Sequence, residues 1–194
     1  MKGSLTVRNI VIAGVLGAVA ILLGVTRLGY IPVPTAAGNA TIMHIPAIIG
    51  GIMQGPIVGA IVGIIFGVSS FLNATVPLFK DPLVAIIPRI FIGVVAWLVY
   101  VGIRRKSEYL AIGTAAFLGT LTNTVLVLTM AVVRGYMGAE VAWTVALTSG
   151  IPEAIVGTIV TLAVVLAWKQ IGKGKKSKIR AAIQITIIMR TYTL

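Results

Sequence analysis

The sequence predicts an all-α integral membrane protein, a single bundle of six transmembrane helices. Of the 194 residues, 58% are hydrophobic and only 10% are charged, and the mean hydropathy is +1.08. This composition excludes a soluble globular domain. One crossing needs about 20 apolar residues, so the chain has room for about six helices and their connections. We expect residues 1–170 to form this bundle and residues 171–194 to form a basic cytoplasmic tail, disordered or interfacial.

The positions of the cations predict the orientation of the bundle. Lys2 and Arg8 precede the first predicted helix, residues 104–106 join two helices with three cations, and residues 169–180 form a basic run. Six crossings place all of these on one side, and an excess of Lys and Arg marks the cytoplasmic side. We therefore expect both termini to be cytoplasmic. The net charge of +12 then faces anionic lipid headgroups rather than nucleic acid.

The first predicted helix, residues 7–28, carries a stripe of small side chains. These are Ala13, Gly14, Gly17, Ala18 and Ala20. Small residues at three- and four-residue spacing let another helix approach closely. The stripe either packs inside the bundle or docks a separate membrane subunit, and the spacing leaves both open. Residues 29–40 contain prolines and glycines that stop the helix, and they predict a loop over a cavity.

Two helices with different features are expected next. The second predicted helix, residues 41–53, is short for a span. It contains His44, the only histidine, so we do not expect a metal site built from imidazoles. His44 is either a polar core residue or a ligand contact. The third predicted helix has a glycine every four residues from Gly55 to Gly67, and the bare face predicts close packing against another helix.

Residues 73–93 bring charges into the apolar sequence. Lys80 and Asp81 end a polar loop, and Arg89 falls inside the next predicted helix. At ~1.5 Å of rise per residue, Arg89 lies about 12 Å along that helix from Asp81, within the depth of a bilayer. A charge at this depth faces a cavity or a partner, so Arg89 is a candidate functional residue. Pro88, directly before it, frees a backbone carbonyl.

Three longer helices complete the expected bundle. They cover residues 83–103, 109–133 and 144–168. Asn123 lies in a polar cluster at membrane depth in the second of these. Tyr136 and Trp143 lie in the loop that follows and suit a membrane interface. Glu153 follows a proline near the start of the last helix, and it is either a ligand contact or the ion-pair partner of Arg89.

The sequence lacks the motifs of membrane-embedded catalysis. A rhomboid-type protease needs a glycine directly after its serine, and the segment with Gly67, Ser69 and Ser70 does not supply one. Residues 172–177, GKGKKS, have the wrong glycine spacing for a phosphate-binding loop. There is no carboxylate pair for acid-base catalysis and no cysteine. We expect no catalytic residue, no metal site and no cofactor held by this chain.

The remaining polar side chains predict a cavity for a small polar molecule. The candidate ligand-binding residues are Asn73, Lys80, Asp81, Arg89, Asn123, Trp143, Glu153 and His44, with Tyr136 at the rim. Fixed donors and acceptors orient such a molecule, while apolar walls exclude water. The excess of cations over acids favours a carboxylate-bearing ligand, unless Arg89 and Glu153 neutralise each other.

Several segments resemble the substrate-binding subunit, or S component, of an energy-coupling factor (ECF) vitamin transporter. The segments are TIMHIPAIIGGIMQGPIVGAIVGIIFG at residues 41–67, DPLVAIIPRIFIG at 81–93, GTLTNT at 119–124 and GIPEAIV at 150–156. Together with the stripe of small residues they extend the resemblance over residues 7–168. The pattern is most similar to the pantothenate-type branch.

The resemblance implies a subunit that binds a water-soluble vitamin from the outside. It implies docking through Ala13, Gly14, Gly17 and Ala18 onto a transmembrane coupling protein, which carries two cytosolic ATPases that use the ATP. The docking motif of the family is alanine-x-x-x-alanine, and here Gly17 replaces the second alanine, which preserves a close approach. Pantothenate is the expected vitamin, and a hydroxymethylpyrimidine or pyridoxine-like ring is the alternative.

Two other classes of protein stay open. A stand-alone secondary transporter predicts an inverted repeat and an acid at mid-membrane; Glu153 supplies the acid, but no repeat is evident. A membrane-embedded enzyme requires a nucleophile and a base within reach of each other, which the sequence does not supply.

Overall fold

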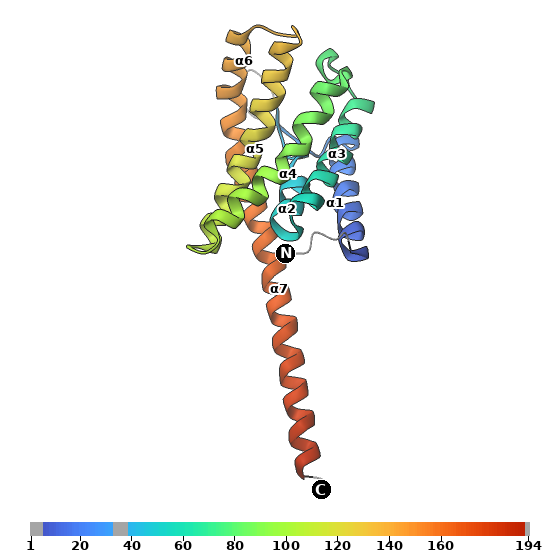
Figure 1. Ribbon diagram of the computed structural model, residues 1–194, viewed down its shortest axis with the longest axis vertical. Helices are drawn as coiled ribbons and strands as arrows, with labels where there is room; N and C mark the ends of the chain where they lie inside the picture. Colours follow the sequence, from blue (N-terminus) through green and yellow to red (C-terminus); the bar gives the residue numbers. More distant parts are fainter. Residues whose placement is uncertain (1–5, 33–38, 193–194) are drawn as a thin grey trace. The chain divides into compact units, whose positions relative to one another are not determined.

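The computed structural model describes residues 6–32 and 39–192 (Figure 1). In chain order the elements are α1 (Val7–Val25), β1 (Tyr30–Pro32), β2 (Asn39–Thr41), α2 (Ile45–Gln54), α3 (Pro56–Leu72), the 3-10 helix η1 (Pro77–Lys80), α4 (Pro82–Ile103), α5 (Glu108–Val133), α6 (Ala139–Val145), the π-helical turn η2 (Ala146–Gly150) and α7 (Ile151–Tyr192). The predicted all-α class is confirmed. Lys2 and residues 33–38 of the predicted loop lie outside the described residues.

The chain forms two compact units, one ending at Leu162 and one beginning at Ala163. The first unit contains α1 to α6 and the start of α7. The second unit continues α7, whose backbone is helical as far as Tyr192. The cavity and the side-chain contacts discussed below all belong to the first unit.

Four helical stretches are long and apolar enough to cross a membrane. They are Val7–Val25, Pro82–Ile103, Glu108–Val133 and Ala139–Ile171. The helices α2 and α3 are apolar but shorter, with 10 and 17 residues. At ~1.5 Å per residue α2 is about 15 Å long, which is about half the thickness of the hydrocarbon core. Four helices of the described chain therefore reach the length of a span by themselves.

Local sequence fixes the starts of the two long central helices. Asp81 is the N-cap of α4, where its carboxylate accepts from the N–H of Leu83 at 3.0 Å and Pro82 takes the first helical position. Ser107 caps α5 in the same way, by accepting from the N–H of Leu110 at 3.5 Å. Side-chain oxygens satisfy N–H groups that the first turn leaves free, and proline has no such group to satisfy. The predicted bounds of both helices agree with the structure to within one residue.

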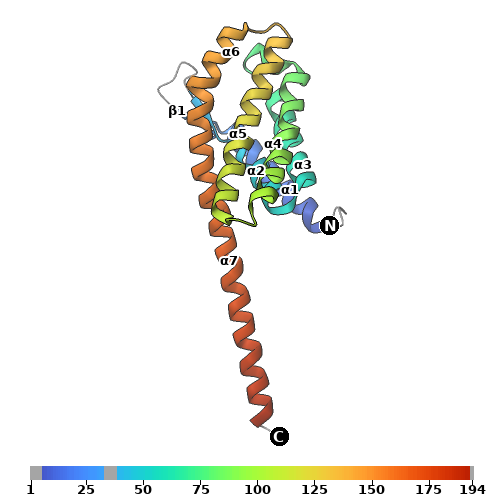
Figure 2. The ribbon, with the colours of Figure 1, turned by 60° about the vertical axis from the view of Figure 1, so that its left-hand side comes forward.

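A short β-hairpin replaces the start of the second predicted helix. β1 and β2 pair antiparallel with Tyr30 opposite Thr41. The helix then begins at Ile45, with His44 as its N-cap and Pro46 in its first turn, where a missing N–H costs nothing. Figure 2 shows this hairpin beside the helices of the first unit. The prediction of a helix from residue 41 is wrong, because Thr41 belongs to β2 and pairs with β1.

Backbone-to-backbone packing joins α3 to α4. A methyl group placed on Gly59 would lie 2.8 Å from Cα of Gly93, and one on Gly63 would collide with the carbonyl oxygen of Arg89. The close packing predicted from the glycine row is confirmed at these positions. Gly55 differs, because a methyl group placed on it would meet nothing within 4 Å. Its role is conformational, since its φ of 106° makes the turn between α2 and α3. The contact at Gly63 fixes the backbone that carries Arg89.

The loop predicted at residues 134–143 is helical in its last part. α6 begins at Ala139, after Gly138, and Glu140 lies in its first turn, where an acid interacts favourably with the helix dipole. The helical path then continues through η2 into α7. The last predicted helix is therefore one continuous helical run with an irregular turn ahead of Glu153.

Candidate ligand-binding cavity

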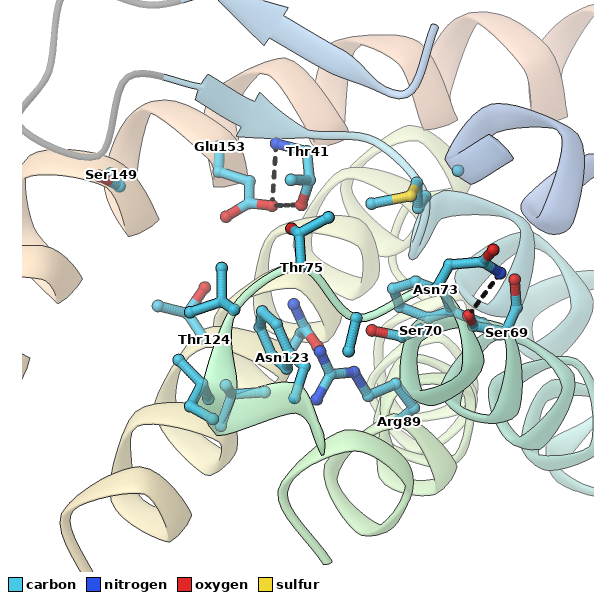
Figure 3. A pocket seen from close by; sticks show the side chains of 18 of the residues that line it. Thr41, Ser69, Ser70, Asn73, Thr75, Arg89, Asn123, Thr124, Ser149 and Glu153 are labelled. Atoms are coloured by element: carbon cyan, nitrogen blue, oxygen red, sulfur yellow. Dashed lines mark hydrogen bonds between the residues drawn. The ribbon is translucent and has the colours of Figure 1, made fainter. Parts of the chain in front are cut away.

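The first unit encloses a cavity of about 920 Å³. Its polar and charged lining residues are Arg27, Thr41, Ser69, Ser70, Asn73, Thr75, Arg89, Asn123, Thr124, Ser149 and Glu153. They come from the segment after α1, from β2, from α3 and the segment after it, from α4 and α5, and from the η2–α7 run. Figure 3 labels all of these side chains except that of Arg27 and shows that they come from separate elements. The volume and the mixed lining are typical of a small-molecule site.

Half of the predicted ligand-binding residues line this cavity. They are Asn73, Arg89, Asn123 and Glu153. The other four, Lys80, Asp81, Trp143 and His44, do not belong to its lining. Lys80 is exposed and Trp143 is 70% exposed, whereas Asp81 and His44 are buried in other contacts. Ligand contact remains a prediction for all eight residues.

Arg89 is a buried cation at the wall of the cavity. Arg89 is only 3% exposed. The guanidinium carbon lies 4.8 Å from the ring centroid of Phe79 and 5.5 Å from that of Phe66. Within the described part of the chain, Nε has no hydrogen-bond partner. The aromatic faces offset part of the cost of removing the cation from water, but they leave its hydrogen-bonding capacity open.

One contact of Arg89 follows directly from Pro88. In a regular helix the carbonyl of Val84 would accept the N–H of the residue four positions later, which is Pro88. Proline has no N–H, and the side chain of Arg89 donates from Nη1 to this carbonyl instead. The free carbonyl predicted from the sequence is therefore present, and it anchors the guanidinium.

Arg89 and Glu153, both within the described residues, do not form an ion pair with each other. Oε1 of Glu153 accepts from the N–H of Thr41 at 3.1 Å and from the hydroxyl of the same residue. It also lies 3.7 Å from Nδ1 of His44. The predicted alternative, in which Arg89 and Glu153 neutralise each other by direct contact, is not observed.

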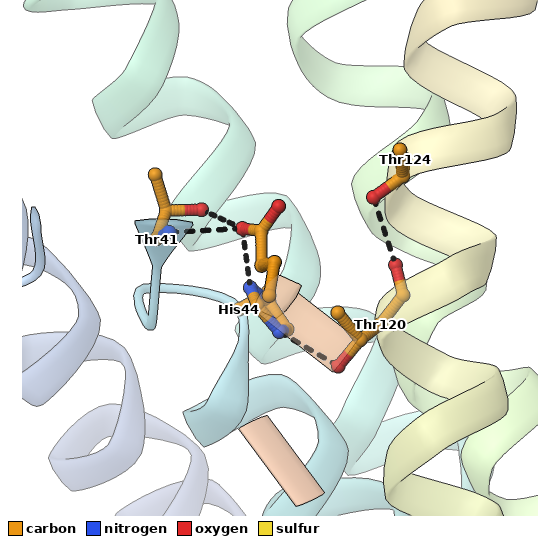
Figure 4. Close-up of polar contacts among 5 residues, drawn as sticks. Thr41, His44, Thr120 and Thr124 are labelled. Carbon is orange, nitrogen blue, oxygen red and sulfur yellow. Dashed lines mark hydrogen bonds and ion pairs between the residues drawn. The ribbon is translucent and has the colours of Figure 1, made fainter. Parts of the chain in front are cut away.

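His44 lies behind Glu153, away from the cavity. It is 0% exposed, and its Nε2 lies 2.9 Å from Oγ1 of Thr120 (Figure 4). The polar cluster predicted in the fifth helix is therefore divided. Thr120 contacts His44, while Asn123 and Thr124 line the cavity. The structure thus gives His44 the position of a buried polar core residue.

A second polar cluster connects the start of α4 to the end of α5. Arg134 donates from Nε to Oδ2 of Asp81 at 2.6 Å, and the hydroxyl of Tyr136 donates to the same oxygen at 3.4 Å. The hydrogen bond from Arg134 holds the pKa of Asp81 below its usual value, and the cap bond from Leu83 acts in the same direction. Asp81 therefore joins two connections that the sequence separates widely.

The small residues of α1 are divided between two faces. Ala13 and Gly17 are buried, and a methyl group on Gly17 would lie 2.7 Å from Cδ1 of Ile65 in α3. Gly14 and Ala18 are exposed, and a methyl group on Gly14 would meet nothing within 4 Å. Of the two interpretations of the stripe, internal packing holds for the first pair. For the second pair, docking of a separate subunit stays a prediction.

The cavity also contains residues that the sequence did not single out. Arg27 lines it with a positive φ of 59°, which is unusual outside glycine. Thr41 reaches it because β2 replaces the predicted helix start. Phe79 had a usable signal, since it directly precedes the charged pair at residues 80 and 81. No periodicity or motif marked the other two.

This fold and this polar cavity agree with a comparison to known families. The chain belongs to the family of ECF transporter substrate-specific components, whose model matches residues 8–168. It is an integral membrane protein of a transport family and not an enzyme. It is 32% identical over 154 residues to the pantothenic acid transporter PanT of Lactococcus lactis subsp. cremoris (strain MG1363). The match covers 66% of this chain and 76% of PanT. The resemblance to this family and to its pantothenate-type branch is confirmed.

Proposed function

We propose that the chain binds pantothenate for an ECF-type importer and that Arg89 receives the carboxylate of the vitamin. Arg89 carries the proposal because it is a buried guanidinium at the cavity, and Nε is unpaired among the described residues. A buried charge requires an opposite charge and satisfied hydrogen bonds. A carboxylate supplies both, since it accepts two parallel N–H bonds from a guanidinium.

The choice of vitamin rests on the chemistry of Arg89 and on the relative. Pantothenate has one carboxylate, one amide and two hydroxyls, and the similar protein PanT is named for pantothenic acid. A hydroxymethylpyrimidine or a pyridoxine-like ring has no carboxylate, so it would leave Arg89 buried without a counter-charge. Pantothenate is therefore the favoured ligand, and these rings remain the alternative.

We propose six crossings with both termini in the cytoplasm. In Figure 1 the α3–α4 and α5–α6 connections lie at one end of the first unit, and the α4–α5 connection lies at the other. The α4–α5 connection contains Arg104, Arg105 and Lys106, which supports a cytoplasmic location for that end. The short helix α2 would share one crossing with the hairpin that precedes it, because α2 alone is too short.

Delivery of the vitamin is proposed to require partners that supply the energy. These are a transmembrane coupling protein and two cytosolic ATPases, which bind the ATP that this chain does not. Membership of the substrate-specific components supports this assignment in general terms. The exposed pair Gly14 and Ala18 supports docking through α1, because small residues admit a second helix.

Two measurements on the full chain test the proposal. Calorimetry on the purified protein in lipid nanodiscs should show saturable binding of pantothenate without any partner. Uptake of radiolabelled pantothenate into proteoliposomes should appear only when the coupling protein, both ATPases and ATP are present. Uptake by the chain alone, without ATP, would instead establish a secondary transporter. Binding of a pyridoxine-like ring in preference to pantothenate would overturn the choice of vitamin.

A further inference from the structure

Among the described residues, the carboxylate of Glu153 is contacted through one oxygen only. All of its contacts within the described chain involve Oε1, which accepts from the backbone N–H and the hydroxyl of Thr41 and lies 3.7 Å from His44. Glu153 lines the cavity, so Oε2 is an acceptor on the ligand side with no partner among the described residues.

His44 lies close to the Oε1 side of the Glu153 carboxylate. Its Nε2 lies 2.9 Å from the hydroxyl of Thr120, and its Nδ1 is buried without a hydrogen-bond partner among the described residues. A neutral imidazole carries its proton on one nitrogen, and a hydroxyl that donates to Nε2 leaves the proton on Nδ1. With Thr120 as the donor, the proton is on the nitrogen that lies 3.7 Å from Oε1 of Glu153, a polar contact longer than a hydrogen bond. His44 does not line the cavity, so its effect on a ligand passes through Glu153.

A second unpaired acceptor faces the same cavity from α5. The amide oxygen of Asn123 is buried without a partner in the described part of the chain. Glu153 bonds to Thr41, and in the view of Figure 3 this pair lies apart from Arg89. The cavity therefore has a cationic part at Arg89 and a separate acceptor at Glu153.

We infer that Glu153 is a specificity-determining residue that accepts hydrogen bonds from the hydroxyls of the ligand, and that His44 is its positioning residue. This inference rests on the proposed function, since it takes the carboxylate of the ligand to lie at Arg89. Pantothenate carries its hydroxyls at the end opposite its carboxylate. One molecule therefore supplies an acceptor for Arg89 and donors for Oε2. The two ends fix the direction in which the ligand enters and exclude carboxylates that lack the hydroxyls.

Two analogues separate the two ends of the ligand. Dideoxy-pantothenate keeps the carboxylate, the amide and the geminal methyl groups and lacks both hydroxyls. Pantothenol keeps the hydroxyls and replaces the carboxylate by an alcohol. The full chain in nanodiscs should bind pantothenate about 10- to 100-fold more tightly than dideoxy-pantothenate, the effect of hydrogen bonds to a charged acceptor.

Glu153→Gln is the first test variant. It should weaken the binding of pantothenate about 10-fold or more. The Kd of dideoxy-pantothenate should stay within about threefold of the wild-type value, because this ligand has no hydroxyl to lose a hydrogen bond. Glu140→Gln makes the same change at an exposed acid of α6 outside the lining and should leave both values unchanged. Equal weakening of both ligands by Glu153→Gln would overturn the inference. Absence of pantothenate binding by the wild type would overturn the proposed function itself.

His44 is tested by a pair of isosteric changes. The amide nitrogen of Asn takes the place of Nδ1, and that of Gln takes the place of Nε2. His44→Asn should keep the preference for pantothenate over dideoxy-pantothenate, and His44→Gln should reduce it about tenfold, because only the former retains a donor to Glu153. A merely structural role predicts that both changes alter both ligands alike, and that result would remove the positioning role.

Discussion

Arg89 donates from Nη1 to the carbonyl of Val84, the acceptor that Pro88 leaves free within α4. A proline that opens a helix and a cation that uses the opened carbonyl thus lie side by side in the sequence. Both residues are buried, and the carbonyl of Arg89 itself packs against Gly63 of α3. The guanidinium is therefore held from its own helix at the wall of the cavity.

Pro88→Ala tests this anchor. Alanine restores an N–H that competes with Arg89 for the carbonyl of Val84, and it also favours the helix. We expect the melting temperature to stay the same or rise while pantothenate affinity falls about 5- to 10-fold, the effect of about one hydrogen bond. Calorimetry and thermal unfolding on the same preparation measure both quantities. Unchanged affinity would show that the orientation of Arg89 does not depend on Val84.

Arg89→Lys tests the proposed carboxylate contact more directly than removal of the side chain. Lysine keeps the charge but loses the planar fork that binds a carboxylate through two bonds. We expect pantothenate affinity to fall by about 1.5–3 kcal/mol, the range for one hydrogen bond to a charged group. Pantothenol, which has no carboxylate, serves as the control ligand and should change far less. An equal loss for both ligands would place the carboxylate elsewhere.

Gly14→Leu and Gly17→Leu separate docking from internal packing on α1. Gly14 is exposed with open space around it, so leucine there should leave folding and pantothenate binding intact and should prevent co-purification with the coupling protein. Gly17 faces Ile65, so leucine there should lower the melting temperature of the chain even without the coupling protein. If Gly14→Leu still co-purifies with the coupling protein, docking through this face is excluded.

The sequence predicted features that depend on neighbours along the chain. The bounds of α4 and α5, the glycine contacts of α3 and the free carbonyl at Val84 all follow from residues within a few positions of each other. Periodicity and proline chemistry act over this range. These predictions needed no knowledge of how the helices assemble.

Contacts between distant residues were beyond the sequence. Glu153 bonds to Thr41 across 112 positions, and Asp81 bonds to Arg134 across 53. An acid near a helix end has the same neighbours in the sequence whether it faces a ligand or an arginine. Asp81 and Glu153 were therefore both predicted to bind the ligand. The two faces of α1 were also ambiguous, because Gly14 and Gly17 are both small and only the packing of α3 distinguishes them.

The pair of Asp81 and Arg134 should make stability depend on pH. Arg134 lowers the pKa of Asp81 in the folded state. The contribution of the pair is therefore fully present above the unfolded value of about 3.9, and it is lost as the pH falls through the lower folded value. Arg134 stays charged throughout, so the loss is due to Asp81.

Asp81→Asn isolates this pair from the helix cap. Asparagine still caps α4 by accepting from Leu83, but it carries no charge. We expect Asp81→Asn and Arg134→Gln to lower the melting temperature at pH 7 and the double variant to lower it little further, since either change removes the same contact. The deficit should shrink at high salt, because the Arg134 side chain is 48% exposed. Additive deficits in the double variant would mean that the two residues stabilise the fold through separate contacts.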